Sequence, residues 1–174
     1  MSKVIFILCI IAYSYSVTFS QSVVNSTTPI RATIVQGLSI SHEEKTSLEY
    51  GEIVLSGQAV TTSIKPSNGA VLLVEGGPDK NVTITYSPAI LSNETWAKQN
   101  SGQKSQMVFT PDLENTGKNN LYLNPSKIVS GNSYKLEKVK NDGRLYLWVG
   151  GSIYVNKTQA EGDYQGTFVV NVTY

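Results

Sequence analysis

Polar and apolar residues alternate along residues 164–174, which read Y-Q-G-T-F-V-V-N-V-T-Y. Successive side chains of a β-strand point to opposite faces, so a strand here gathers its apolar and aromatic side chains on one face. That face would carry Tyr164, Gly166, Phe168, Val170, Val172 and Tyr174. The pattern predicts a strand whose apolar face lies in the core of the domain.

Short runs with the same period of two recur along most of the chain, between clusters of glycine, proline, asparagine and aspartate. The predicted strands are 30–35, 38–41, 48–54, 60–65, 70–75, 81–86, 107–110, 133–140, 145–155 and 164–174. Many short strands with little helix are typical of an all-β antiparallel β-sandwich. The sequence therefore predicts that fold class, with polar loops at 42–47 and 112–120.

Local turn signals refine this prediction. The loop 76–80 contains two glycines and separates two β-rich runs, which predicts a hairpin between 70–75 and 81–86. Asn141-Asp142-Gly143 predicts a second hairpin between 133–140 and 145–155. Gly150-Gly151 predicts a bend or bulge inside the last of these strands. In 89–99, breaking residues limit helix formation to one short turn.

The N-terminal residues differ in composition from the rest. Lys3, the apolar run 4–12 and small or hydroxyl residues up to Ser20 are typical of a Sec signal peptide, so residues 1–20 are expected to be removed on export. Residues 21–36 form a polar extension whose later part alternates, with Ile30, Ala32 and Ile34 on one face. Residues 37–174 would be the folded domain of the exported chain.

Composition excludes several classes of protein. The formal net charge is only +1, and its basic residues are scattered, which gives no support to nucleic-acid binding. The one cysteine, Cys9, lies in the predicted signal peptide, so the exported chain would have no disulfide. Such a domain is held by its core and its sheet hydrogen bonds.

No motif for catalysis or for a cofactor is present in the sequence. The one histidine, His42, is expected to be a solvated loop residue. Two acidic pairs could in principle bind calcium or act as glycosidase carboxylates, although neither has the spacing of a known calcium motif. These pairs are Asp112 with Glu114 and Glu161 with Asp163. We therefore expect no enzyme activity, no metal and no cofactor.

Trp96 lies outside the regular strand pattern and is the better candidate for an exposed aromatic contact, whereas the strand tyrosines are expected in packing. Five N-x-S/T triplets also occur, and the abundance of asparagine and threonine accounts for them as composition. They begin at Asn25, Asn81, Asn93, Asn156 and Asn171.

Two segments resemble a known family. One is A-T-I-V-Q-G-L-S-I at 32–40, followed by L-E-Y-G-E-I at 48–53, and the other is L-Y-L-W-V-G-G-S-I-Y-V at 145–155, followed by G-D-Y-Q-G-T-F-V-V-N-V-T-Y at 162–174. Together they resemble a family of exported bacterial domains of unassigned function. The family is similar to major pilins of the Mat (common pilus) type, which alternative chaperone–usher systems assemble. Gly37 replaces the usual proline of the family pattern, and Tyr50 the usual phenylalanine.

The resemblance implies an immunoglobulin-like sandwich that lacks one strand, which the N-terminal extension of the next subunit supplies. On that reading Ile30, Ala32 and Ile34 are donor-strand contacts. The acceptor groove would be formed by Phe168, Val170, Val172 and Tyr174. The implied partners are further copies of the chain, a periplasmic chaperone and an outer-membrane usher. The terminal strand would be the part that the chaperone holds.

Two alternatives remain open at this point. The chain could be a monomeric binding module in which residues 30–35 pair within their own sheet, and loops around Trp96 and 112–120 bind a glycan or a host protein. It could also be an enzyme that uses loop carboxylates, although no motif positions an acid and a base.

Overall fold

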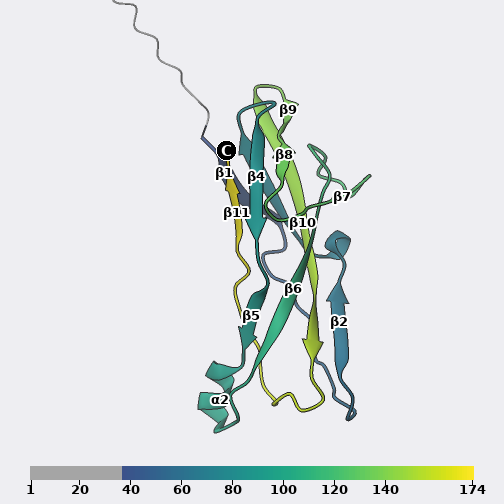
Figure 1. Ribbon diagram of the computed structural model, residues 1–174, viewed down its shortest axis with the longest axis vertical. Coiled ribbons are helices and arrows are strands. Elements are labelled where there is room, and N and C mark those ends of the chain that lie inside the picture. The colour runs from purple at the N-terminus through teal and green to yellow at the C-terminus, as the bar shows by residue number, and fades with distance from the viewer. Residues whose placement is uncertain (1–36) are drawn as a thin grey trace, which may run out of the picture. The chain divides into compact units, whose positions relative to one another are not determined.

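A computed structural model describes residues 37–174, which fold into two antiparallel β-sheets packed face to face (Figure 1). The predicted all-β sandwich is confirmed. No helix in residues 37–174 is long and apolar enough to cross a membrane.

The larger sheet is built around β10 (Asp142–Val155), which lies between β3 (Ala70–Gly76) and β6 (Gln106–Asn115). Both faces of β3 and most of β10 are buried, and their sequences are accordingly almost continuous apolar runs. The remaining strands of this sheet are β1 (Ser39–Glu44), β2 (Val60–Ile64), β5 (Ala89–Ser92), β7 (Ser126–Lys127) and β9 (Glu137–Val139).

The smaller sheet has three strands, in the order β11 (Val170–Thr173), β4 (Asn81–Tyr86) and β8 (Ser133–Lys135). Figure 1 shows these strands in front of the upper part of the larger sheet. The helical elements are the single 3-10 turn η1 (Pro66–Asn68) and the seven-residue α2 (Glu94–Asn100). The helix is therefore longer than the single turn that we predicted.

Between the two sheets the buried core forms two clusters, and a third cluster, of Val71, Leu73, Tyr146 and Trp148, lies on the outer face of the larger sheet. The first lies under the smaller sheet and contains Ala70, Leu72, Val74, Val82, Ile84, Leu113, Ile128, Leu136, Leu145, Leu147 and Val149. The second contains Ala89, Met107, Phe109, Ile153 and Val155. Besides Leu91 of β5, segments without strand structure cover this second cluster, through the partly buried residues Leu48, Tyr50, Ile53, Leu55, Tyr164 and Phe168.

The predicted hairpin between 70–75 and 81–86 is wrong, although both strands exist. Strand β3 belongs to the larger sheet and β4 to the smaller one, so the loop between them crosses from one layer to the other. Leu136 fixes this crossing, since its backbone accepts from the N–H of Asp79 (3.0 Å) and donates to the carbonyl of Lys80 (2.8 Å). Because β3 already pairs with β1 and β10, neither of its edges is free for β4.

Other boundaries also differ. Strand β6 runs on to Asn115, so 112–115 is strand rather than loop, and β1 includes His42, which we expected in a loop. The second predicted hairpin is confirmed between β9 and β10, with its turn at Lys140 and Asn141, one or two residues earlier than expected. Lys140 adopts a positive φ of 55° in that turn.

Candidate functional site

Among residues 37–174, strand β11 lies at the edge of the smaller sheet and pairs only with β4. Its alternation is as predicted, because Phe168, Val170 and Val172 are partly buried and pack against the first core cluster. Tyr174 is 54% exposed, and its hydroxyl accepts a hydrogen bond from the backbone N–H of Gly77 (2.8 Å). The hydrogen-bonded strand covers only 170–173 of the predicted 164–174.

The backbone groups of β4 show which way those of β11 point. The N–H of Tyr86 donates to the Ser130 hydroxyl (2.9 Å), which in turn donates to the Tyr86 carbonyl (2.7 Å). The carbonyl of Ile84 accepts from Gly131 (2.8 Å). The main-chain groups of Tyr86 and Ile84 therefore point away from β11.

Val170 lies opposite Tyr86, and Val172 lies opposite Ile84. Residues opposite each other in an antiparallel pair either exchange both backbone hydrogen bonds or exchange neither. Val170 and Val172 thus belong to the second kind, and their N–H and C=O groups point outward from the sheet. In the described part of the chain no strand lies on that side of β11. The same two residues direct apolar side chains inward and unpaired main-chain groups outward.

On the same flank of the sandwich as β11, the described part of the larger sheet ends with the edge strand β1. Ile40 lies opposite the core residue Val74, so its side chain is on the inner face, and yet it is 44% exposed. Leu38, just before β1, and Tyr174, just after β11, both lie beside Gly76. Figure 1 shows β1 and β11 on one side of the two layers. The inner-face side chain of Ile40 thus stays partly exposed between two edge strands of the described residues.

The segment 48–55 covers part of this flank. A strand was predicted at 48–54, but none forms, because no described strand lies beside this segment to provide hydrogen bonds. Its side chains nevertheless keep the orientation that a strand would need, with Leu48, Tyr50, Ile53 and Leu55 turned toward the core. Gly51, with φ of 68°, interrupts the alternation between the two halves of the segment.

The proposed donor contacts Ile30, Ala32 and Ile34 lie outside the described residues, as do the expected signal peptide and extension. Of the predicted acceptor residues, the structure brings Phe168, Val170 and Val172 together on one face. Sequence reasoning missed the outward backbone groups and the contribution of 48–55. The alternation of apolar and polar residues in 48–55 could have revealed that this segment packs on the core. Alternation does not show, however, whether a strand has a neighbour to pair with.

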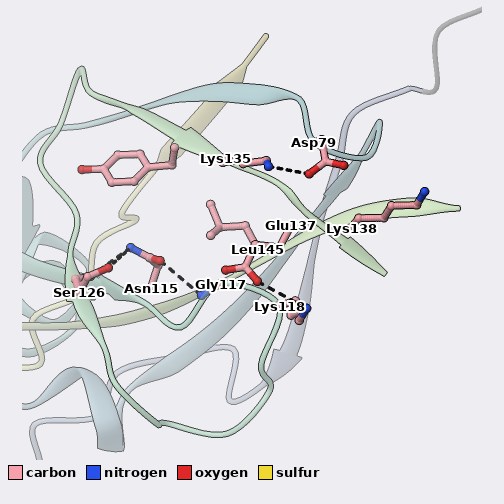
Figure 2. Close-up of a pocket in the computed structure, with 10 residues that line it drawn as sticks. Asp79, Asn115, Gly117, Lys118, Ser126, Lys135, Glu137, Lys138 and Leu145 are labelled. Atoms are coloured by element: carbon pink, nitrogen blue, oxygen red, sulfur yellow. Dashed lines mark hydrogen bonds and ion pairs between the residues drawn. The ribbon is translucent and has the colours of Figure 1, made fainter. Parts of the chain in front are cut away.

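A pocket of about 580 Å³ lies at another place, between β8, β9 and the loop after β6 (Figure 2). Apart from Lys138, its charged side chains form pairs, Lys135 with Asp79 (2.6 Å) and Lys118 with Glu137 (3.9 Å). The hydrogen bond from Lys135 holds the pKa of Asp79 below its ordinary value. Asn115 bonds Ser126, as Figure 2 also shows. Within each ion pair the two charges neutralise each other. Among the side chains that line this pocket, no base lies next to a nucleophile.

The acidic pairs have structural contacts. Asp112 lies 3.4 Å from the Lys127 ammonium, and Glu114 accepts a hydrogen bond from the Tyr122 hydroxyl. The backbone carbonyl of Glu161 accepts from the Asn93 side chain (2.9 Å). Within residues 37–174 no three His, Cys, Asp or Glu side chains gather as a group that could hold a metal ion.

Trp96 is partly buried rather than fully exposed. Its ring lies against Gly102 and Gly162, where any added Cβ atom would collide with it. A small hollow of about 110 Å³ beside the ring is lined by Ser92, Thr95, Gln99, Asp163 and Gln165. This arrangement of an aromatic ring with polar groups around it could contact a small polar ligand.

Comparisons with known proteins identify the domain only by family. No curated protein and no solved structure matches the chain. The family model described as "Domain of unknown function (DUF4402)" matches residues 38–174, nearly all of the described sandwich. This agrees with the expected membership of a family of unassigned function, while kinship with pilins stays a prediction. The chain belongs to the DUF4402 family.

Proposed function

We propose that this protein is a non-enzymatic structural subunit of a bacterial surface fibre, assembled by β-strand donation between copies. The observation that carries the proposal is the edge of β11. There Val170 and Val172 turn apolar side chains inward and main-chain N–H and C=O groups outward. Strand addition uses main-chain bonds for affinity and alternate side-chain pockets for specificity. The edge of β11 offers both.

The proposed occupant is residues 30–35 of a second copy, with Ile30, Ala32 and Ile34 facing the core. Exposed strand edges generally carry charges, proline or a cover that prevents pairing with other chains. Strand β11 has no charged residue and no proline. Burial of on the order of 500 Å² of apolar surface would contribute about 12 kcal/mol at ~25 cal/mol per Å². Ordering of the donated segment opposes part of this gain.

Export belongs to the same proposal. A Sec signal peptide at 1–20 would direct the chain to the periplasm and then to the cell surface. Before assembly, a periplasmic chaperone would cover the edge of β11, and an outer-membrane usher would exchange that cover for the next subunit. These partners rest on the family resemblance of the sequence.

The test is the behaviour of the exported protein on a gel without boiling. A ladder of oligomers that collapses to one band on boiling is expected. A variant that lacks residues 21–35 should lose the ladder and remain folded when produced with its chaperone. A wild-type protein that stays monomeric at high concentration would overturn the proposal.

A monomeric binding module is the second candidate, and the hollow beside Trp96 favours it. In that case residues 30–35 would complete their own sheet. Deletion of residues 21–35 would then lower the free energy of unfolding of the monomer, because the fold itself would lose a strand. If the variant without residues 21–35 loses the ladder but keeps the stability of the monomer, the result supports the fibre subunit over the binding module.

A further inference from the structure

Part of the outer face of the larger sheet carries no charged side chain. It spans four neighbouring strands, in the order β2, β10, β6 and β5. Successive strand residues point to opposite faces, so its residues are those that alternate with inward side chains such as Phe109 and Ile153. We call this surface the neutral face, and it consists of Thr61, Ser63, Ile90, Ser92, Gln106, Val108, Thr110, Ser152 and Tyr154.

Three large apolar side chains form a row across the middle of the neutral face. Ile90 lies opposite Val108. In the same way Phe109 lies opposite Ile153, so Val108 is beside Tyr154 on the next strand. Ile90 is 52% exposed, Val108 47% and Tyr154 58%. Serine, threonine and glutamine surround the row. An apolar centre with a polar rim is the usual anatomy of a protein–protein contact.

The rest of the same outer face is charged. Asp112 and Glu114 follow on β6, and Glu75 of β3 pairs with Arg144 of β10 (3.0 Å). A partner that covers the neutral face must itself be uncharged at the contact, because a charged group would lose its hydration there without gaining an opposite charge. The neutral face of a second copy meets this requirement.

The size of the neutral face indicates what kind of contact it can make. Four strands about 4.8 Å apart, with about three outward positions roughly 6.7 Å apart on each, cover on the order of 400 Å². A stable interface buries about 800 Å² on each partner. A single pair of neutral faces would therefore separate readily, whereas many pairs held in line along two fibres would act together.

Strand donation would leave the neutral face open. The donated strand would lie beside β11, which belongs to the smaller sheet, whereas the neutral face is on the outer side of the larger sheet. Each subunit of a fibre would then present one neutral face. A glycan fits this surface less well, because two of the three central side chains are aliphatic and only Tyr154 could stack on a sugar ring.

We propose that the neutral face of one copy packs against the neutral face of a copy in a neighbouring fibre, so that fibres associate side by side. This inference rests on the proposed function, since single copies would bind one another only weakly. A contact between identical faces is two-fold symmetric, and the residue nearest the axis meets its own equivalent. Val108 is the middle residue of the apolar row, so it lies at the centre of the contact.

The first test compares Val108→Lys with Val129→Lys in the exported full-length protein. The two valines are similarly exposed, 47% and 51%, but Val129 lies outside the neutral face, between β7 and β8. Both variants should give the unboiled ladder. In electron micrographs wild type and Val129→Lys should form bundles of fibres. In Val108→Lys the bundled fraction should fall about tenfold or more, because the contact would bury a charge without a partner.

Two further measurements distinguish this contact from a folding defect and from an attraction between charges. Val108→Thr keeps a β-branched side chain and removes apolar surface, so it should fold normally and still weaken bundling. Wild-type bundles should persist at high salt, since the neutral face contributes no charge that salt could screen. Bundles that dissolve at high salt would contradict the proposed contact.

A cysteine at the centre of the neutral face tests the contact directly. The chain without its predicted signal peptide has no cysteine, so an introduced cysteine has no background. Under mild oxidation the fibres of Val108→Cys should form disulfide-linked pairs of chains much faster than those of Val129→Cys. Equal rates would overturn the face-to-face contact.

The outcomes keep this inference distinct from the proposed function. A wild-type ladder with single fibres only, or Val108→Lys fibres that bundle as wild type does, would overturn the lateral contact and leave strand donation standing. Single wild-type fibres that bind cellulose, with that binding lost in Val108→Lys, would overturn it in favour of a neutral glycan. A wild-type chain that never leaves the monomeric state would overturn both proposals.

Discussion

Tyr122 links the loop after β6 to the outer face of the larger sheet. Its ring packs edge-on against Trp148 (5.1 Å between centroids), and its hydroxyl donates to Glu114. Burial, then the hydrogen bond to Glu114 and its negative charge, raise the pKa of Tyr122 from 10.0 to about 12. The folded state thus holds this proton more tightly than the unfolded chain does.

This shift predicts a loss of stability in alkali. The contribution is fully present below pH 10 and is lost as the pH rises from 10 towards 12, because only the unfolded tyrosine releases its proton there. In Tyr122→Phe the free energy of unfolding should fall less steeply over that range than in wild type. Urea unfolding at several pH values measures the slope, with Tyr154→Phe as the control. An equal slope in Tyr122→Phe and wild type would contradict the prediction.

Single residues also show what a sequence conceals. Asn93 begins an N-x-T triplet and follows a strand, which gives no sign of burial, yet it is 0% exposed. Its side chain donates to the carbonyls of Gln103 (3.0 Å) and Glu161 (2.9 Å) and accepts from Ser105 (2.7 Å). The partners lie up to 68 residues away, so local pattern could not predict this joint. Burial also removes Asn93 from the surface where glycosylation would act.

At the scale of elements, the alternation of apolar and polar residues predicted where strands lie but not which strands pair with each other. Strand β4 was predicted with correct bounds because Val82 and Ile84 alternate with polar residues. Its pairing was wrong because neighbours in sequence compete with distant edges, and here β11 and β8 pair with β4. The strand predicted at 48–54 does not form for a related reason. Alternation shows which side chains share a face, whereas a strand also needs a neighbouring strand for its hydrogen bonds.

Gly150 marks the one large irregularity of β10. On one edge, β10 pairs with β2 up to Ile64 and with β3 from Ala70, so residues 65–69 all lie opposite Gly150. The predicted irregularity at Gly150 thus lies opposite the short insertion 65–69, which contains η1. A Cβ atom on Gly150 would collide with the Ile64 carbonyl and lie 2.6 Å from the Pro66 nitrogen.

We therefore expect Gly150→Ala to lower the free energy of unfolding by about 3 kcal/mol, because the obstructing atoms belong to backbone that cannot rotate away. Denaturant unfolding measures the change. Gly37→Ala is the matched control, since nothing lies within 4 Å of its Cβ position, and it should change stability by less than about 0.5 kcal/mol. Equal effects of the two substitutions would show that the backbone around Gly150 yields.

At the scale of the whole molecule, the two sheets are unequal. The larger sheet has eight strands and the smaller has three, so the second cluster on the larger sheet lies under segments that form no sheet. The terminal alternation predicted which side chains of β11 face inward. It could not predict that β11 would be an edge, because that depends on which strands are absent beside it.

Proline scanning of β11 tests the proposed use of that edge. Val172→Pro removes an outward N–H and keeps the hydrogen bonds to β4, whereas Asn171→Pro removes an N–H that faces Thr85. Val172→Pro should fold as a monomer and lose the unboiled ladder. Asn171→Pro should unfold at lower denaturant concentration, because it breaks the small sheet. Normal assembly of Val172→Pro would contradict a role for the outward edge.

The direction of β11 has a mechanical consequence under the proposed assembly. A donated strand would lie lengthwise along β11, so tension along the fibre would pull it parallel to its partner. Such a load is shared by all the main-chain bonds at Val170 and Val172 at once, whereas a sideways pull would open them one after another. The joint between subunits would therefore resist shear far better than peeling, as a surface filament exposed to flow requires.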